Sequence, residues 1–326
     1  MKAIVAVGER KVELKEMPQL KPVAGEVRIK TAAVGICATD FTMIDGCKRA
    51  HYPAILGHEW SGIIDAVGLG VDKSIVGSHC VAENVLKDCG EVGFEHPGGY
   101  GEYFITEAKN IELIPRDFPL TTAALIEPLA VSVRGITRLR LQKYDSAFIF
   151  GDGPIGLIMT MLLKREGVGE IVLAGGRPNR LKLARQLGAK QPINYHEIKG
   201  DLADGISKIT KKNFPNVIEA SGSAAAMKAC LSLGEPCAHI LMLGDYGEAK
   251  ADFPWLHMLH KEYEIIGSNA SAGAWAEAAR LAVAREIPLE KLVTHTFAPE
   301  DYAKALELAR SRNEEVIKVV IDWSKP

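Results

Sequence analysis

The sequence GDGPIG, residues 151–156, constrains the fold more than any other feature of the chain. It follows the strand-like apolar run SAFIF and opens the run PIGLIMTMLLKRE, which is typical of a helix. In this strand, turn and helix context, a G-x-G-x-x-G pattern makes a tight turn, lets a pyrophosphate approach the backbone and packs the helix on the strand. The motif predicts a dinucleotide at the start of the helix, bound by Gly151, Gly153, Pro154, Ile155 and Gly156.

The pattern of the chain changes at Ser146. Before it, short β-branched runs separated by glycine, such as VRIKTAAVGI and GYGEYFITEA, predict an antiparallel, barrel-like β domain. After it, strand-length apolar runs alternate with helical segments, which predicts a doubly wound parallel sheet. Helices are expected near residues 272–285 and 299–311, before a last strand VIKVVI that rejoins the first domain. A length of 326 residues fits two such domains.

Composition excludes several classes of partner. With 47% hydrophobic and 25% charged residues and a formal net charge of -2, the chain is typical of a globular protein without a surface for nucleic acid or anionic membrane. The N-terminal apolar run is too short for a signal peptide, and the longest apolar run is too short to span a membrane. Its six cysteines form no C-x-x-C pair. We therefore predict a cytoplasmic enzyme that acts on a small molecule.

The segment IVLAGGRPNR, residues 171–180, bears on the choice of nucleotide. About twenty residues after the glycine motif, an NAD enzyme carries Asp or Glu for the ribose 2′-hydroxyl. Here that position is Gly175, while Arg177 and Arg180 offer planar donors suited to a 2′-phosphate. The segment predicts NADP(H) rather than NAD(H), the alternative being that the arginines belong to a solvated loop and the first turn of a helix.

A second set of residues suits a metal. Cys37 lies in GICATD, His58 and Glu59 lie in PAILGHEW, and Glu127 lies in ALIEPLAVSV. Thiolate, imidazole and carboxylate together suit Zn²⁺, and a site with fewer than four protein ligands keeps a position open for water or substrate. Taken singly, each residue also has a structural interpretation, as a core cysteine, a hydrogen-bonded core histidine or an acid at the start of a helix.

GICATD, GHEWSG, IEPLAV and GDGPIG, in this order, resemble the zinc-containing medium-chain dehydrogenase/reductase family, especially its polyol (sorbitol-like) dehydrogenase branch. The resemblance implies a GroES-like catalytic domain over residues 1–128 and 268–326 and a Rossmann domain over residues 129–267. It also implies that Cys37, His58 and Glu59 bind zinc, with Glu127 a further ligand or the partner of the zinc-bound water.

The resemblance assigns further roles around both sites. Thr39, together with Glu59, is an expected catalytic residue, its hydroxyl shuttling the proton of the alcohol, and Asp40 orients a ligand. The sequence LAGGRPNRLKLARQLGA followed by INY is similar to NADP-dependent members, in which arginine meets the 2′-phosphate and a tyrosine, here Tyr195, lies beside the adenine.

Two departures from the family pattern change the expectations. Members usually carry a lobe with four cysteines that hold a structural zinc, but residues 82–100 contain only Cys89, so we expect a single, catalytic zinc. Thr42 stands where many relatives have a relay histidine, so the proton must leave by another route. Because relatives form dimers or tetramers, the resemblance implies a homo-oligomer.

The sequence therefore predicts a zinc-dependent, NADP(H)-preferring dehydrogenase that interconverts a secondary alcohol of a polyol or sugar derivative with its ketone. One alternative is a simple secondary-alcohol dehydrogenase or carbonyl reductase with smaller apolar substrates. Another is a protein that binds NADP(H) without turnover, although nucleotide binding alone does not require an open metal site.

Overall fold

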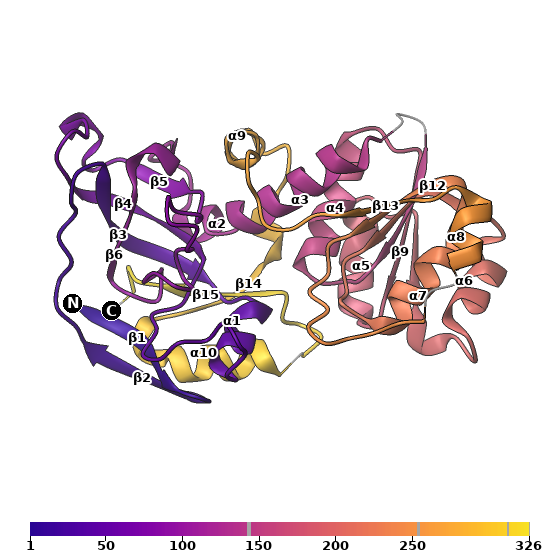
Figure 1. Ribbon diagram of the computed structural model, residues 1–326, viewed down its shortest axis with the longest axis horizontal. Coiled ribbons are helices and arrows are strands. Elements are labelled where there is room, and N and C mark those ends of the chain that lie inside the picture. The colour runs from indigo at the N-terminus through magenta and orange to yellow at the C-terminus, as the bar shows by residue number, and fades with distance from the viewer. Residues whose placement is uncertain (142–144, 253–254, 312, 326) are drawn as a thin grey trace. The chain divides into compact units, whose positions relative to one another are not determined.

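A computed structural model describes residues 1–141, 145–252, 255–311 and 313–325 (Figure 1). The chain forms two compact units, one made of residues 1–130 and 272–326 and the other of residues 131–271. The boundary on the N-terminal side falls inside the helix α3 (Ile126–Leu139). The unit formed by the two end segments of the chain is the outer-segment unit, and the unit formed by the middle of the chain is the nucleotide unit.

The nucleotide unit is a parallel sheet with helices on both of its faces. The strands follow the order β10-β9-β8-β11-β12-β13, and every neighbouring pair is parallel. Figure 1 shows α4 and α5 on one side of the sheet and α6 and α7 on the other. The strands are β8 (Ser146–Phe150), β9 (Glu170–Gly175), β10 (Gln191–Asn194), β11 (Phe214–Glu219), β12 (Gly234–Met242) and β13 (Glu264–Gly267). The helices are α4 (Pro154–Arg165), α5 (Pro178–Leu187), α6 (Leu202–Thr210), α7 (Ala224–Leu233), α8 (Trp255–Lys261) and the short η3 (Tyr195–Glu197).

The outer-segment unit is built on a mainly antiparallel sheet. Its strands follow the order β14-β15-β3-β4-β5-β7, with β6 also paired to β3 and a separate β1-β2 hairpin. The long strand β3 is central, so that β4 and β15 both pair with its C-terminal end. The strands are β1 (Lys2–Gly8), β2 (Lys11–Glu16), β3 (Glu26–Gly35), β4 (Glu59–Val67), β5 (His79–Ala82), β6 (Tyr103–Glu107), β7 (Ile111–Ile114), β14 (Val293–Phe297) and β15 (Lys318–Asp322).

Short helices complete this unit. They are α1 (Ala38–Ile44), α2 (Leu120–Ala123), α9 (Trp275–Val283), α10 (Tyr302–Arg310), η1 (Lys73–Ile75), η2 (Ala108–Asn110), η4 (Leu289–Leu292) and η5 (Pro299–Asp301). The core of the unit contains Ile4, Ile29, Trp60 and Phe104, all fully or almost fully buried, and α10 contributes Ala305 to it. The C-terminal segment therefore returns to the β domain, through α10 and β15.

The hydrophobic patterns of the sequence correspond closely to these elements. The runs at residues 146–150 and 154–166 become β8 and α4, and the last strand, expected at residues 316–321, is β15. Apolar residues of the parallel strands, such as Phe148, Val172 and Val217, are completely buried because helices cover both faces of the sheet. Among the described residues, no helix combines the length and the apolar composition that crossing a membrane requires.

Candidate active site

The pairing of β3 with β4 brings the predicted metal ligands together. In the antiparallel register, Gly35 at the end of β3 lies opposite Glu59 at the start of β4. Cys37 follows two residues after Gly35, and His58 immediately precedes β4. A side chain at position 35 would collide with the Glu59 carboxylate, so the glycine leaves room for that group. Residues that are about twenty positions apart in the chain therefore meet at one end of the sheet.

The structure gathers a thiol, an imidazole and a carboxylate into one cluster. Ligand atoms of Cys37, His58 and Glu59 all lie within 4.8 Å of one another. His58 and Glu59 are buried, and Cys37 is partly exposed. These are the three ligand types of protein zinc sites, and a three-ligand set is typical of catalytic zinc. The residues present fit a zinc ion.

Asp40 holds the cluster in place from the first turn of α1. Its Oδ2 accepts hydrogen bonds from the Cys37 backbone N–H at 2.8 Å and from the Tyr100 hydroxyl at 3.1 Å. Its Oδ1 lies 3.4 Å from His58 Nδ1, longer than a normal hydrogen bond. Asp40 therefore fixes the backbone of one ligand and faces the ring of another, as expected for a residue that orients a metal ligand.

The charge state of His58 reflects these neighbours. Burial lowers the pKa of the imidazole, but Cys37 and Asp40 outweigh this effect and raise the pKa well above its usual value. Phe94 stacks on the ring, with centroids 4.7 Å apart. The cluster thus favours a positive charge at this point, and a bound metal cation satisfies the same preference.

Lys318 is a member of the site that the sequence analysis missed. Its Nζ lies 2.6 Å from both carboxylate oxygens of Glu59 and 3.2 Å from the Ile36 carbonyl oxygen. Both side chains are almost completely buried, at 4% and 2% exposure. Burial lowers the pKa of the Lys318 ammonium, but Glu59 and Cys37 reverse the effect and leave the pKa above its usual value. A lysine inside the apolar strand VIKVVI was the available signal, since buried lysines are almost always paired.

Glu127 and Thr39 lie at different distances from the cluster. The Glu127 carboxylate is not one of the three groups within 4.8 Å. It lies within electrostatic reach: burial raises its pKa to about 7, a rise that the charge of His58 opposes and that of Glu59 increases. Thr39 Oγ1 is 3.6 Å from Cys37 Sγ, which places a hydroxyl beside the thiol. Thr42 and His51, in contrast, are exposed.

The segment of residues 82–100, where the resemblance implied a cysteine-rich lobe, packs against the cluster. Arg49 forms ion pairs with Glu91 and Glu95, and its guanidinium lies over the ring of Phe94, the residue that stacks on His58. A side chain at Gly93 would meet the backbone of His58, so the lobe packs directly against this residue. Cys89 is exposed at the tip. Ion pairs and packing therefore hold the segment in which the resemblance implied four cysteines.

The glycine motif has a different local geometry at each of its three glycines. Gly151 has a φ of +112°, a conformation for the tight turn after β8. A side chain at Gly156 would collide with the carbonyl oxygen of Gly151, whereas Gly153 has open space around its Cα. Gly153 also caps α4, and Pro154 occupies the first turn, followed by Ile155. The loop lies where the strand order reverses between β8 and β11, the usual place for a ligand in an open parallel sheet.

The segment of residues 171–180 was expected to favour NADP(H) because Gly175 stands in place of an acid, and the structure adds one feature to this. Gly175 ends β9 without a carboxylate of its own, but the carboxylate of Asp152, from inside the glycine motif, lies beside it. A Cβ at position 175 would be 2.7 Å from Asp152 Oδ2. An acid therefore lies beside the end of this strand, although it comes from the neighbouring loop and not from β9. The sequence spacing of the second strand alone does not reveal this.

The two predicted arginines both contact Asp152, one at its carboxylate and the other at its backbone carbonyl oxygen. Arg177 donates to Asp152 Oδ1 from Nη1 at 2.9 Å, and Arg180 lies 3.4 Å from the Asp152 carbonyl oxygen. Burial, with the charge of Arg177, lowers the pKa of Arg180 to about 10, so it stays protonated at neutral pH. Tyr195 is 44% exposed and packs over Gly176, where a side chain would meet its ring. The predicted residues therefore lie together at the ends of β9 and β10.

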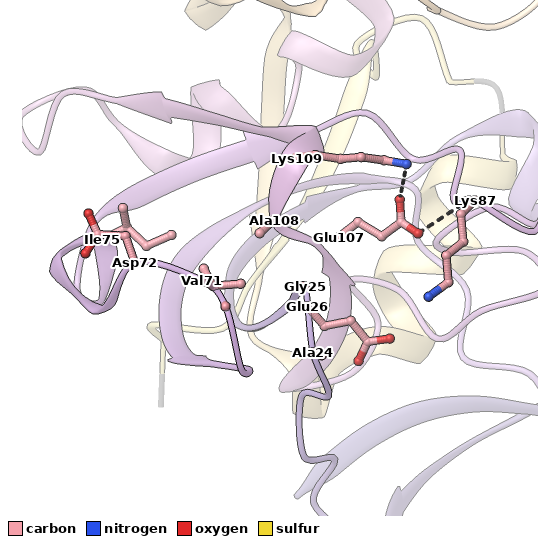
Figure 2. A pocket seen from close by; sticks show the side chains of 11 residues that line it. Ala24, Gly25, Glu26, Val71, Asp72, Ile75, Lys87, Glu107, Ala108 and Lys109 are labelled. Carbon is pink, nitrogen blue, oxygen red and sulfur yellow. Dashed lines mark hydrogen bonds and ion pairs between the residues drawn. The ribbon is translucent and has the colours of Figure 1, made fainter.

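A cavity of about 560 Å³ in the outer-segment unit is distinct from the cluster (Figure 2). It is lined by residues of β3, η1, η2 and the adjoining loops, among them Glu26, Asp72 and Glu107. The Glu107 carboxylate already accepts from the Lys87 backbone N–H at 3.0 Å and pairs with Lys109 at 2.8 Å, as the dashed lines in Figure 2 indicate. None of the three clustered ligands lines this cavity, and we assign no chemistry to it.

Comparison with known proteins decides the family. Residues 154–284 match the zinc-binding dehydrogenase family, and residues 23–116 match the alcohol dehydrogenase GroES-like domain. The chain belongs to the zinc-binding dehydrogenase family. The predicted GroES-like and Rossmann folds and a zinc- and nicotinamide-dependent dehydrogenase activity are thereby confirmed.

Relatives of this dehydrogenase match it over nearly its whole length. A sorbitol dehydrogenase of Halalkalibacterium halodurans is 27% identical over 98% of the chain and 99% of its own length. A galactitol 1-phosphate 5-dehydrogenase of Escherichia coli K12 is 28% identical over 95% of the chain and 97% of its own length. The predicted similarity to the polyol branch is therefore confirmed. A crystal structure of a short chain alcohol dehydrogenase from Escherichia coli CFT073, in complex with NADH, has a TM-score of 0.92 and 27% identity and covers 99% of both chains.

Proposed function

We propose that this dehydrogenase transfers hydride between NADP(H) and a secondary alcohol of a polyol or sugar derivative, using one zinc ion. The observation that carries the proposal is the cluster of Cys37, His58 and Glu59 within 4.8 Å, with a carboxylate as the third ligand. The names of the sorbitol and galactitol 1-phosphate dehydrogenases support the substrate class.

In the proposed site, Cys37, His58 and Glu59 hold the metal. Zinc supplies Lewis-acid activation of the alcohol, and the nicotinamide supplies the hydride acceptor. Asp40 keeps Cys37 and His58 oriented. The Thr39 hydroxyl, 3.6 Å from Cys37 Sγ, would accept the alcohol proton at Oγ1 while it passes its own proton on to water. Lys318 balances the charge of Glu59, and Glu127 adds a carboxylate that can serve as a further ligand or hydrogen-bond a coordinated water. Protons leave by a route that does not use a histidine at position 42.

Arg177, Arg180 and Tyr195 support a preference for NADP(H). Arg177 pairs with the carboxylate of Asp152 and Arg180 lies at the backbone carbonyl oxygen of the same residue, so two guanidinium groups against one carboxylate leave a net positive charge where the adenosine 2′-phosphate is expected. Gly175 and Gly176 present no side chain, and Tyr195 next to them provides a ring for the adenine. The glycine loop, Gly151 to Gly156, provides the site for the pyrophosphate.

Replacing Arg177 by Ala is expected to weaken NADP⁺ binding by about 1.5–3 kcal/mol, the range for hydrogen bonds to charged groups. Binding of NAD⁺, which lacks the 2′-phosphate, should change little. Titration calorimetry with both nucleotides measures the two losses. Arg185→Ala, which removes an exposed guanidinium from the same helix, is the matched control and should leave both affinities unchanged. An equal loss for NAD⁺ and NADP⁺ in the Arg177 variant would refute the assignment.

The activity itself is tested by initial rates of nicotinamide reduction with polyols, sugar phosphates and simple secondary alcohols, each with NADP⁺ and NAD⁺. Turnover of a polyol or its phosphate, faster with NADP⁺, is the expected result. Turnover limited to small apolar alcohols would instead identify a simple secondary-alcohol dehydrogenase. Tight NADPH binding without metal and without turnover would favour a protein that only binds the nucleotide.

The sequence-based expectations of a cytoplasmic location, a homo-oligomer and a single zinc ion without a structural zinc belong to the same proposal. The last of these is supported by Cys89, which is the only cysteine of the lobe and is exposed. Metal analysis of the purified protein counts the zinc ions, and its molar mass in solution gives the oligomeric state.

A further inference from the structure

We propose that Asp152 is a specificity-determining residue for the nucleotide: its carboxylate is a built-in anion that competes with the 2′-phosphate for Arg177 and so limits the preference for NADP(H). The inference rests on the proposed use of Arg177 in 2′-phosphate binding. It concerns a residue inside the glycine motif to which the sequence analysis gave no role.

Three donors converge on this carboxylate. Asp152 Oδ2 accepts from the backbone N–H groups of Gly176 at 3.0 Å and Arg177 at 2.8 Å. Oδ1 accepts from Arg177 Nη1 at 2.9 Å. Two consecutive backbone N–H groups and a guanidinium form a cradle of the kind that binds anions, and α5 begins immediately after it at Pro178. The Asp152 side chain is 8% exposed, so the carboxylate fills this cradle from inside the protein.

The cradle is also specific to the sequence around it. Because a Cβ at position 175 would be 2.5 Å from Asp152 Cβ, only glycine at the end of β9 leaves room for this side chain. With glycine at position 175, the acid at this place comes from Asp152 in the first loop instead of from the second strand. The acid keeps its position near the ribose, but it also holds the arginine that a 2′-phosphate would use.

Electrostatics gives the direction of the effect. A 2′-phosphate at Arg177 must either displace the Asp152 carboxylate from the guanidinium or bind close to a like charge, and both reduce its affinity. A ribose 2′-hydroxyl carries no charge, so it meets no such repulsion and can donate to the remaining acceptor capacity of Oδ1. Asp152 therefore lowers the selectivity for a 2′-phosphorylated nucleotide while it tolerates the unphosphorylated one.

Calorimetric binding of adenosine 2′,5′-bisphosphate and adenosine 5′-monophosphate tests the proposal without substrate or turnover. Asp152→Asn keeps the side-chain size and removes the charge, and it should raise the ratio of the two affinities in favour of the bisphosphate at least about tenfold. Asp152→Ser, made in parallel, removes the carboxylate with a smaller side chain and should act in the same direction. Thermal unfolding of each variant verifies that the nucleotide unit is folded.

Two further variants separate this effect from a general change of charge or structure. Asp204→Asn makes the same change of charge at an exposed position of the nucleotide unit and should leave the ratio unchanged. Asp152→Asn combined with Arg177→Ala should lose the gain, because the gain requires the released guanidinium. An unchanged or lower ratio in both Asp152 variants would overturn the inference and leave Asp152 as a support for Arg177. The ratio of the unmodified protein tests the NADP(H) preference separately, since that preference can fail while the Asp152 shift remains.

Discussion

Replacing Cys37 by Ser is expected to abolish zinc binding and to reduce turnover by more than about a hundredfold, since loss of even an outer partner of a zinc ligand costs 10–100-fold. Cys37 supplies the single thiolate of the cluster, and its Sγ is one of the ligand atoms within 4.8 Å of one another. A serine hydroxyl is a poorer zinc ligand because it does not ionise near neutral pH, whereas a thiol loses its proton on coordination. The remaining imidazole and carboxylate are too few to hold the ion firmly.

Zinc content after dialysis measures the first effect. Initial rates with the polyol, sugar phosphate or alcohol that the protein oxidises measure the second. NADPH binding serves as the control for folding, because the residues assigned to the nucleotide all lie in the other unit, residues 131–271. Cys47→Ser is the matched variant: it removes a partly exposed thiol whose Sγ lies 3.6 Å from Met43 Sδ, and it should retain zinc and activity. A Cys37→Ser protein that keeps its zinc would show that this cysteine is not a ligand, and full activity without metal would refute the mechanism.

The sequence predicted the nucleotide unit well because its signals are local. A strand, a glycine turn and a helix succeed one another within about twenty residues, and the alternation of apolar runs with helical segments continues to β13. The grouping of Cys37 with His58 and Glu59 was less accessible to local patterns. It depends on the register between β3 and β4, which cannot be derived from a single sequence. That part of the prediction therefore came from the family resemblance.

The residues that were missed are those whose role depends on side-chain direction or on distant pairing. Lys318 meets Glu59 across 259 positions, through the pairing of β15 with β3. Asp152 was visible in the glycine motif, but its carboxylate turns toward the end of β9, and no spacing rule indicates this direction. Lys318 brings a charge from an apolar strand to Glu59, and Asp152 brings one to a strand end that itself carries only glycine.

Replacing Lys318 by Met is expected to lower the free energy of unfolding of the metal-free outer-segment unit by about 3–5 kcal/mol, the usual cost of breaking a buried ion pair. The substitution keeps a long apolar side chain but leaves the Glu59 carboxylate, 2% exposed, without its ammonium partner. Urea unfolding in the presence of a chelator, followed by tryptophan fluorescence, measures the loss, since Trp60, Trp275 and Trp323 all lie in this unit.

A double variant distinguishes lost charge pairing from lost packing. Glu59→Gln with Lys318→Met removes both charges, so it should recover much of the stability, because no uncompensated charge then remains buried. Lys304→Met breaks a pair with Asp301 in which the lysine is 74% exposed, and it should leave the stability almost unchanged because water screens the pair. If the double variant is no more stable than Lys318→Met alone, the ammonium is not there to neutralise Glu59, and the charge balance assigned to this side of the metal cluster is wrong.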